Sequence, residues 1–251
     1  MLTPERIAKK IAKGGKYSRR KAEDLIKSGK VEVNNKIIST PNFLVTDSDI
    51  IKINGKSLKI ILEVPKLWLL NKPKGILTTK KDPKGRPTIY NLLPVSLQHA
   101  LYVGRLDFNS EGLLLLSNSG ELVNYLTSAK NNIKRVYQVK TFGKIKQEQL
   151  DKLKKGIVIH GTYYRKIDAT IIKQNNLQTW ISFALLEGKN NEIRNICKSL
   201  GLQVSHLVRT SFGPFVLNKL NKGETKEISI KQLKKLFPFL FKKQEITSAT
   251  L

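Results

Sequence analysis

The chain has 251 residues, of which 46 are Lys or Arg and 19 are Asp or Glu, so its formal net charge at pH 7 is +27. Its length and 40% hydrophobic content suit one large domain or two, and no apolar run is long enough to span a bilayer. The single cysteine excludes an internal disulfide framework, and three scattered histidines offer no metal-ligand cluster. Residues 1–16 lack the apolar block of a signal peptide, so we expect a soluble protein of the cytoplasm.

The positive charge is the first indication of function. So large an excess repels itself unless a polyanion binds it or a large surface dilutes it, and nucleic acid is the usual polyanion. Lysine supplies 37 of the 46 basic residues, so many of them can belong to an ordinary solvated surface. The nine arginines are more informative, because a planar and permanently charged guanidinium suits phosphate binding and stacking.

The N-terminal part of the chain predicts two helices followed by a hairpin. A capping pattern at residues 3–5 begins a helix that runs to about Ala12. Ser18 is the expected N-cap of a second helix, which Gly29 ends. Residues 31–37 then alternate as in a hairpin around two asparagines.

Three consecutive cations, Arg19, Arg20 and Lys21, lie at the expected start of the second helix. The positive end of a helix disfavours cations unless an anion joins them, and an RNA phosphate would supply that anion. Residues 1–40 carry eleven Lys or Arg against four Asp or Glu, which agrees with this interpretation. A solvated helix start is the alternative.

This pattern resembles the alpha-L RNA-binding module that is named after a small-subunit ribosomal protein. The likeness lies in Tyr17-Ser18-Arg19-Arg20-Lys21-Ala22, Ile26-Lys27-Ser28-Gly29-Lys30-Val31 and Val33-Asn34. Such modules occur in many RNA-handling proteins and identify no reaction. The resemblance implies that residues 1–63 bind RNA, and the boundary with the next domain is expected near residues 63–66.

Short apolar runs between turn signals predict many strands in the remainder of the chain. The runs are Leu67–Leu70, Ile76–Thr79, Leu101–Val103, Leu113–Leu116, Val136–Thr141, Ile157–Ile159, Ile167–Ile172, Trp180–Leu186 and Val204–Val208. Helical periodicity interrupts them at Glu121–Leu126, Gln147–Leu153 and Glu192–Leu200. This order predicts an α+β domain with a mainly antiparallel sheet over residues 66–217, and not a doubly wound parallel sheet. Residues 218–251 are expected as a basic tail with a short helix at 230–237.

Several common chemistries lack their characteristic motifs. The sequence has no phosphate loop of the Gly-x-x-x-x-Gly-Lys type, no Gly-x-Gly-x-x-Gly, no Gly-x-Ser-x-Gly and no Cys/His spacing for a metal. We therefore expect a reaction without cofactor or metal. Carboxylates, tyrosines, lysines and arginines remain as candidate catalytic groups.

The most unusual segment is Val103-Gly104-Arg105-Leu106-Asp107-Phe108-Asn109-Ser110-Glu111-Gly112, which precedes the apolar run at 113–116. Asp107 lies in a loop bounded by glycines, where a side chain can be presented into a cleft. A carboxylate held there would lose water unless a cation paired with it. From spacing alone, an ordinary turn with Arg105 paired to Asp107 or Glu111 on the surface is the favoured interpretation.

A resemblance to a known family reverses that preference. Gly104-Arg105-Leu106-Asp107 followed by Ser110-Glu111-Gly112-Leu113-Leu114-Leu115-Leu116-Ser117-Asn118 looks like the signature of the RNA pseudouridine synthases that act on ribosomal RNA. Three further stretches resemble the family's other motifs in the same order: Asn71-Lys72-Pro73-Lys74-Gly75, Lys134-Arg135-Val136-Tyr137-Gln138-Val139, and 187–195 with 201–214. Lys189 and Asn191 stand where arginine is usual, which bears on phosphate binding by that loop and not on the reaction.

The resemblance implies three catalytic residues. Asp107 corresponds to the aspartate that converts uridine to pseudouridine, moving the bond to the sugar from N1 to C5 of the base. Arg194 corresponds to an arginine that forms an ion pair with this aspartate, and Tyr137 to a tyrosine that packs against the target base. Without the resemblance, Arg194 would be an exposed residue of its helix and Tyr137 a half-buried core residue.

The resemblance also implies substrate contacts. Arg105 corresponds to the residue that fills the space left by a flipped nucleotide, and Leu207 to one that closes the pocket wall, with core packing as its alternative. Lys72, Lys74 and Arg135 are candidate phosphate contacts, although a lysine in a loop is usually just solvated. With Arg19, Arg20 and Lys21 they complete the predicted RNA-binding set.

The leading hypothesis is a monomeric pseudouridine synthase that acts on ribosomal RNA, or on an assembling ribosomal particle, without membrane or cofactor. Large-subunit RNA is the first choice because the motifs and the basic tail look more like the enzymes of that subunit. The alternatives are an enzyme for small-subunit RNA, a non-catalytic RNA-binding assembly factor, and a hydrolytic glycosidase. The glycosidase would need a second carboxylate, for which Glu111 and Glu192 are the nearby candidates.

Overall fold

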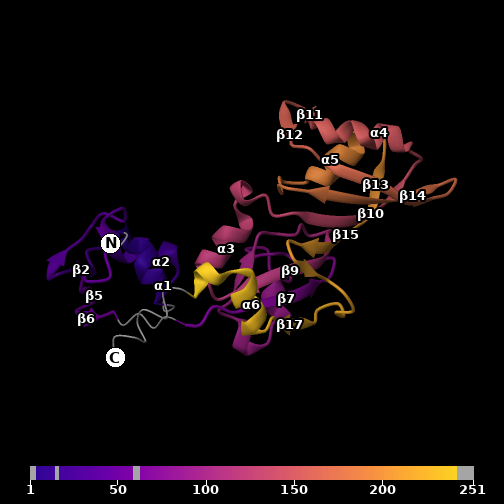
Figure 1. Cartoon of the computed structure of the whole chain (residues 1–251). Helices are drawn as coiled ribbons and strands as arrows, with labels where there is room; N and C mark the ends of the chain where they lie inside the picture. The colour runs from indigo at the N-terminus through magenta and orange to yellow at the C-terminus, as the bar shows by residue number, and fades with distance from the viewer. Residues whose placement is uncertain (1–3, 15–16, 59–62, 242–251) are drawn as a thin grey trace. The chain divides into compact units, whose positions relative to one another are not determined.

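A computed structural model describes residues 4–14, 17–58 and 63–241 of the chain. These residues divide into two compact units, the first ending at Val64 and the second beginning at Pro65. Figure 1 labels the elements of both. Among the described residues, no helix is both long enough and apolar enough to cross a membrane.

The first unit packs two helices against short strands. Its elements are β1 (Glu5–Arg6), α1 (Ile7–Lys13), α2 (Arg19–Lys27), β2 (Val31–Val33), β3 (Lys36–Ile37), β4 (Leu44–Val45), β5 (Ile51–Ile53) and β6 (Lys56–Ser57). The strands form a β1-β4 pair and a sheet in the order β3-β2-β5-β6. Ile7, Ile11 and Ile26 are fully buried at the centre of this unit.

The helix start and stop predicted from the sequence are present in α2, but the predicted start of α1 is wrong. The Ser18 side chain accepts a hydrogen bond from the backbone N–H of Lys21, and Gly29 adopts the left-handed conformation (φ +66°). The helix expected from Pro4 instead begins at Ile7, because the two preceding residues pair with β4 as a strand. Residue 3, the expected N-cap, lies outside the described residues.

The second unit is built on one nine-stranded sheet. Its strands are β7 (Leu67–Lys72), β8 (Leu101–Val103), β9 (Glu111–Ser117), β10 (Arg135–Phe142), β13 (Asp168–Gln174), β14 (Gln178–Leu185), β15 (Gln203–Phe212), β16 (Phe215–Val216) and β17 (Thr225–Glu227). The path through the sheet is β13-β14-β10-β15-β9-β7-β17, with β16 beside β15 and β8 beside β9. All pairs are antiparallel except β15 with β9, so the mainly antiparallel α+β fold is confirmed.

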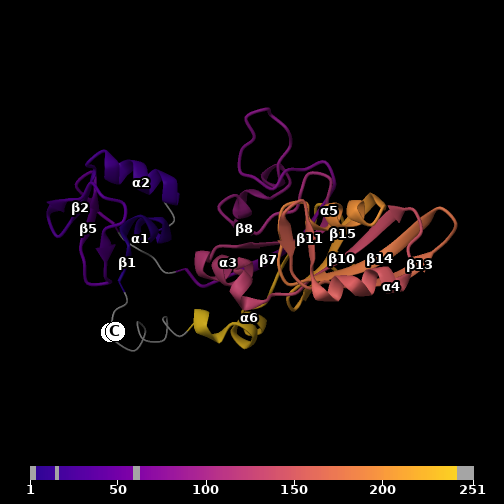
Figure 2. The same cartoon turned by 90° about the horizontal axis from the view of Figure 1, so that it is seen from above.

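Helices and a small hairpin complete the second unit. They are α3 (Gly120–Thr127), α4 (Gln147–Asp151), α5 (Glu192–Ser199), α6 (Ile230–Leu236), the hairpin of β11 (Ile157–Ile159) and β12 (Thr162–Tyr164), and 3₁₀ turns at Ile89–Asn91, Val95–Leu97, Ala129–Asn131, Lys152–Lys155 and Pro238–Leu240. Helices α4 and α5 lie over the half of the sheet formed by β13, β14 and β10, as two views show (Figures 1 and 2). Their apolar residues share one core with that half.

Two expectations for this unit are wrong. Residues 76–79 form no strand and contribute only a single bridge between Leu77 and Thr88. Residues 218–241 are not a separate tail, because β17 pairs with β7 along the edge of the sheet and Leu233 of α6 is fully buried in the core beneath it. The sequence pattern did not predict this pairing, because the segment is rich in lysine and the strand has only three residues. The expected helix near 230–237 is present.

Candidate active site

One pocket of about 280 Å³ lies in the second unit and is lined by all three residues predicted to be catalytic. Asp107 comes from the loop before β9, Tyr137 from β10 and Arg194 from α5. The volume is near the lower end of the range for small-molecule sites. The fold thus brings the three predicted residues, far apart in the chain, to one place.

The backbone of the Asp107 loop is held at several points by the entry motif and its neighbours. The Lys72 ammonium donates to the carbonyl oxygens of Asp107 (3.1 Å) and Ser110 (2.8 Å). The Thr78 hydroxyl donates to the carbonyl oxygen of Leu106 at 2.8 Å. The backbone N–H of Gly75 donates to the carbonyl oxygen of Phe108 at 2.8 Å. This anchoring fixes the direction in which the loop presents the Asp107 carboxylate.

The Asp107 side chain is exposed where it lines the pocket. The carbonyl oxygen of Asp107 accepts the backbone N–H of Ser110 at 3.0 Å, which closes a tight turn. Within the described part of the chain, no ion pair joins Asp107 to Arg105, and Glu111 pairs instead with Lys222 at 2.6 Å. The interpretation of an ordinary turn with a surface ion pair to Arg105 is therefore not what the structure shows.

Arg194 supports the same turn from the opposite side. Its guanidinium donates to the carbonyl oxygen of Asn109 at 2.9 Å, two residues beyond Asp107. The ion pairs among the described residues do not include one between Arg194 and Asp107, so the ion pair implied by the resemblance is absent from this arrangement. The Arg194 guanidinium instead donates to a backbone carbonyl, and Asp107 is exposed.

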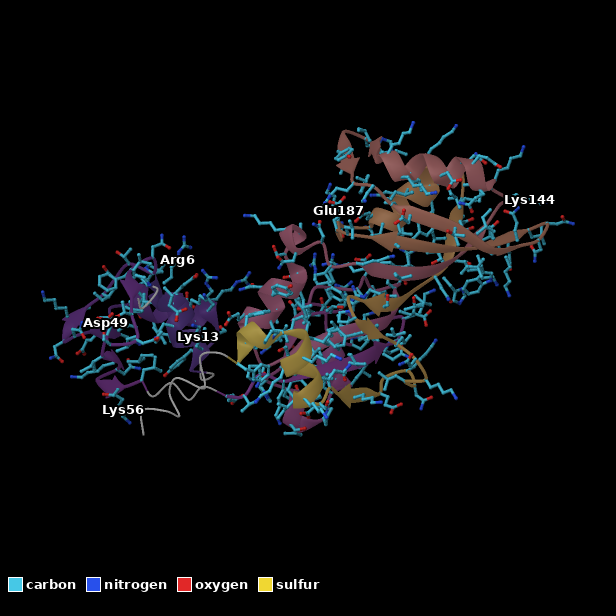
Figure 3. All side chains as sticks on the ribbon, in the orientation of Figure 1. Arg6, Lys13, Asp49, Lys56, Lys144 and Glu187 are labelled. Carbon is cyan, nitrogen blue, oxygen red and sulfur yellow. The ribbon has the colours of Figure 1, made fainter. Side chains whose placement is uncertain are left out.

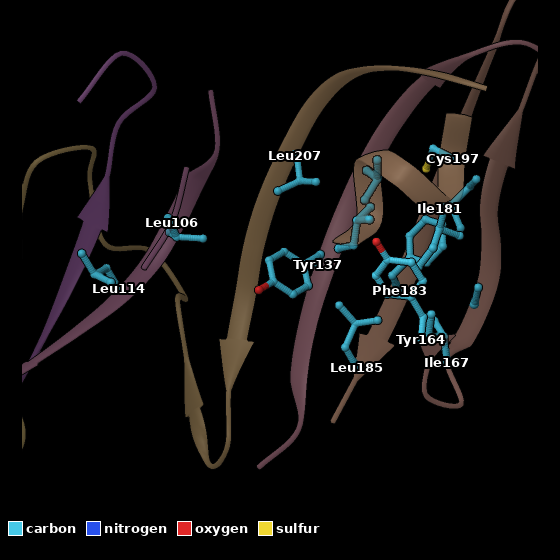
Figure 4. Close-up of a cluster of buried hydrophobic side chains, with 14 of the residues drawn as sticks. Leu106, Leu114, Tyr137, Tyr164, Ile167, Ile181, Phe183, Leu185, Cys197 and Leu207 are labelled. Atoms are coloured by element: carbon cyan, nitrogen blue, oxygen red, sulfur yellow. The ribbon is translucent and has the colours of Figure 1, made fainter. Parts of the chain in front are cut away.

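Tyr137 and Leu207 form the apolar wall of the pocket. They lie on the neighbouring strands β10 and β15, and their side chains are 8% and 5% exposed. Figure 4 shows both side chains grouped with Leu185 of β14 on the same side of the sheet. Leu207 both lines the pocket and belongs to the core, so the two sequence interpretations do not exclude each other.

Arg209 is a buried pocket residue that sequence reasoning did not single out. It lies opposite Tyr137 in the strand register, and its guanidinium is 6.0 Å from the Tyr137 ring centroid. Its Nε donates to the carbonyl oxygen of Leu113 at 2.7 Å, while one terminal nitrogen is buried without a partner. Alternation along β15 was the available signal, because Arg209 follows Leu207 by two residues and must face the same side.

Two predicted phosphate contacts are wrong. Lys72 is fully buried, and burial lowers the pKa of its ammonium to about 8, although the nearby carboxylates of Asp107 and Glu111 oppose this shift. Arg135 is 6% exposed, and its guanidinium donates to three backbone carbonyl oxygens, those of Leu126, Ile133 and Leu186. Both cations therefore support loops around the pocket and are not free to bind phosphate.

The remaining predicted contacts lie on the surface. Arg105 and Lys74 are exposed, the first on the lining of the pocket and the second beside the anchored turn at Gly75. Arg19, Arg20 and Lys21 are exposed in the first turn of α2, where Arg19 lies 3.7 Å from Glu23. These side chains are accessible to RNA.

Glu192, at the start of α5, is a buried carboxyl group in the pocket wall. Its Oε2 accepts the backbone N–H of Lys189 at 2.8 Å, which closes the loop between β14 and α5. Burial, together with the adjacent carboxylate of Glu187 that Figure 3 labels, raises the pKa of Glu192 to about 7, against the opposing hydrogen bond from Lys189. Glu192 is thus partly protonated near pH 7.

Comparison with known proteins agrees with this geometry. Residues 66–199 match the model of the RNA pseudouridylate synthase family. The chain belongs to this family. Residues 5–51 match the S4 domain, the module named after the ribosomal protein. The RNA-modifying isomerase and the N-terminal RNA-binding module expected from the sequence are confirmed.

Individual relatives cover nearly the whole chain. A protein of Rickettsia typhi named as an uncharacterized RNA pseudouridine synthase is 39% identical over 92% of this chain and 94% of its own length. The ribosomal large subunit pseudouridine synthase B of Bacillus subtilis is 36% identical over 92% of this chain and 95% of its own. A crystal structure of a pseudouridylate synthase superposes with a TM-score of 0.67 at 25% identity, covering 92% of this chain and 99% of that one.

Proposed function

We propose that this synthase converts a specific uridine of large-subunit ribosomal RNA to pseudouridine, with Asp107 as its catalytic carboxylate and without a cofactor. The observation that carries the assignment of Asp107 is its presentation, by an anchored turn, into a pocket that Tyr137 and Arg194 also line. Relatives named as large-subunit enzymes support the choice of substrate. The proposal also takes the enzyme to act as a monomer.

The isomerisation needs four events at the target nucleotide. The bond between N1 of uracil and C1′ of the sugar breaks, the base turns while it remains bound, C5 bonds to C1′, and C5 loses its proton while N1 gains one. A carboxylate can act on the nucleoside as nucleophile or base, so Asp107 can serve all of this without a metal. The exposure of its side chain leaves it accessible to an incoming nucleotide.

The neighbouring residues have distinct parts in this proposal. Tyr137 stacks against the uracil, a contact that contributes on the order of 1–3 kcal/mol per base. Leu207 closes the wall behind the base, and Arg194 holds the Asp107 turn and supplies positive charge beside it. A paired uridine must be flipped out at a cost of a few kcal/mol, and Arg105 fills the vacated space.

The N-terminal unit and the pocket rim bind the rest of the RNA in this proposal. Arg19, Arg20 and Lys21 meet phosphates at the start of α2, and Lys74 does so beside the pocket. The buried Lys72 and Arg135 have no part in this contact. Naked ribosomal RNA and an assembling particle both offer such a surface.

The test is a map of pseudouridine in ribosomal RNA from cells with and without this protein. We expect loss of at least one modified position in the large-subunit RNA when the protein is absent, and its return when the gene product is supplied. Loss confined to small-subunit RNA would assign the enzyme to the other subunit. Unchanged maps, with RNA binding intact, would favour the non-catalytic assembly factor, and release of free uracil the hydrolytic glycosidase.

A further inference from the structure

Among the described residues, no helix covers one face of the half of the large sheet that contains β13, β14, β10 and β15. Helices α4 and α5 pack on the other face, where the alternate residues of β10 and β14 are buried. The intervening residues, such as Trp180 of β14 and Lys140 of β10, remain partly exposed. We call the side chains that project from this uncovered side of β13, β14, β10 and β15 the open face.

A row of four side chains crosses the open face. The strand register places Trp180 directly between Lys173 of β13 and Lys140 of β10, and Lys140 opposite His206 of β15. The ammonium groups of Lys140 and Lys173 lie 6.0 and 5.9 Å from the centroid of the Trp180 ring. The row therefore combines an aromatic surface with two cations and an exposed imidazole.

Charge along the row itself has one sign. Strands β10, β14 and β15 contain no Asp or Glu, and the acidic residue of β13, Asp168, pairs with Ala184 at the far end of the strand from Lys173. Exposed apolar side chains adjoin the row, with Phe142 46% and Ile172 50% exposed. Lysines beside aromatic and apolar surface, without carboxylates, match the chemistry of single-stranded nucleic acid, whose phosphates need cations and whose bases need stacking partners.

Strand β15 carries both a residue of the pocket wall and one end of the row. Between residues 203 and 207, β15 pairs with β10 alone among the described strands, because β9 joins β15 only at Val208 and Arg209. His206 and Leu207 are adjacent on that free edge, and their side chains point to opposite faces. The row therefore ends at the residue next to the pocket wall, on the opposite face of β15.

We propose that the row Lys173, Trp180, Lys140 and His206 binds a single-stranded segment of the substrate RNA beside the target nucleotide. One base stacks at Trp180, and the two lysines contact the flanking phosphates. This inference rests on the proposed function only in taking RNA as the substrate. In this inference the open face binds RNA, and the catalytic residues take no part in that contact.

The experiment measures the affinity of the full chain for a ribosomal RNA fragment that extends beyond the target loop. Trp180→Thr keeps a β-forming residue at this position, and we expect it to weaken binding about fivefold or more. Lys140→Gln with Lys173→Gln should weaken binding similarly and make it less dependent on salt. The matched control is Lys152→Gln with Lys155→Gln, which removes two exposed lysines on the helix-covered side, and it should leave affinity unchanged.

Intrinsic fluorescence gives a second measurement. The chain has two tryptophans, and Trp68 is buried, with its indole N–H bonded to Glu227. In a Trp68→Phe background, RNA should quench Trp180, because a base stacks on its ring. Normal turnover of Trp180→Thr on a minimal target loop separates this site from catalysis, whereas loss of turnover in Asp107→Asn concerns the proposed function alone.

Two results would overturn the inference. The first is RNA affinity equal to wild type in both open-face variants, with no quenching of Trp180. The second is unchanged binding to naked RNA with weaker retention on a ribosomal particle, since that result would assign the open face to a protein partner.

Discussion

The arginines at the start of α2 in the first unit differ in burial from two arginines beside the pocket in the second. In the first unit, Arg19, Arg20 and Lys21 stand exposed at the beginning of a helix. In the second, Arg135 and Arg209 are almost wholly buried beside the pocket and donate to backbone carbonyls. Both pack on Phe212, with guanidinium carbons 4.7 and 4.9 Å from its ring centroid. The cations proposed to bind RNA are exposed, whereas these two arginines beside the pocket are internal.

This difference teaches that net charge alone does not locate the RNA contacts. A buried guanidinium has lost its water and already has partners, so it cannot also neutralise a phosphate. Burial lowers the pKa of Arg135 for the same reason. A cation at the surface keeps its water, so placing it there costs little free energy. Such a cation contributes to RNA affinity through counterion release. The predictions below separate these two roles.

Among the changes to basic residues, the largest effect is expected for Arg194→Ala, which removes the support of the Asp107 turn at Asn109. Turnover should fall by about 100-fold or more, because a misplaced catalytic group is costly, while RNA affinity stays nearly unchanged. Single-turnover kinetics and a binding titration on the same RNA check this split. Lys198→Ala, an exposed change on the same helix, is the control. Wild-type turnover in Arg194→Ala would remove this residue from the site.

Arg209→Met should destabilise the second unit by about 2–4 kcal/mol, because it deletes a buried hydrogen bond and the packing around the guanidinium. Arg105→Met, at an exposed position, should change stability by no more than about 0.5 kcal/mol. Urea unfolding followed by tryptophan fluorescence measures the second unit alone, since both tryptophans lie in it. Equal stability of the two variants would contradict the distinction between internal and exposed cations.

Arg19→Glu with Arg20→Glu should weaken RNA binding about tenfold at moderate salt and reduce the salt dependence of the affinity, because phosphate contacts are lost. The fold of the first unit should persist, since both side chains are exposed. Affinity measured over a range of salt concentrations checks this. A salt dependence identical to wild type would show that the start of α2 does not bind RNA.

The smallest effect concerns Glu192 and pH. Its pKa is raised from 4.5 to about 7 by folding, so its favourable contribution is present below about pH 4.5 and is lost as the pH rises through about 7. Glu192→Gln should therefore be more stable than wild type at pH 8, by about 1–2 kcal/mol, and nearly equal to it at pH 5. Thermal unfolding at both pH values tests this, and a difference that does not change with pH would refute it.

Much of the fold followed from local patterns. The long apolar runs became β7, β9, β10 and β14, and the Ser18 cap and the Gly29 stop act as expected. The edge strand β17 was not predicted, because three residues rich in charge show no periodicity. Its partner β7 is also far away in the sequence. The failed strand at 76–79 shows that an apolar run without a neighbouring strand to pair with stays a loop.

Sequence motifs located the candidate site, but they did not show what its cations do in the structure. Sequence likeness selected Asp107, Tyr137 and Arg194, which do line one pocket. It could not show that Lys72 is turned inward to bind carbonyls, because a lysine next to a proline in a loop is normally solvated. Only the three-dimensional structure separates a cation that holds a loop from one that meets RNA.

The most direct test of the account is pseudouridine formation by Asp107→Asn, with RNA binding measured on the same preparation. The substituted side chain keeps its shape but has no negative charge. The account predicts binding close to wild type and turnover lower by about 1,000-fold or more. Pseudouridine formed at the wild-type rate by Asp107→Asn would contradict it.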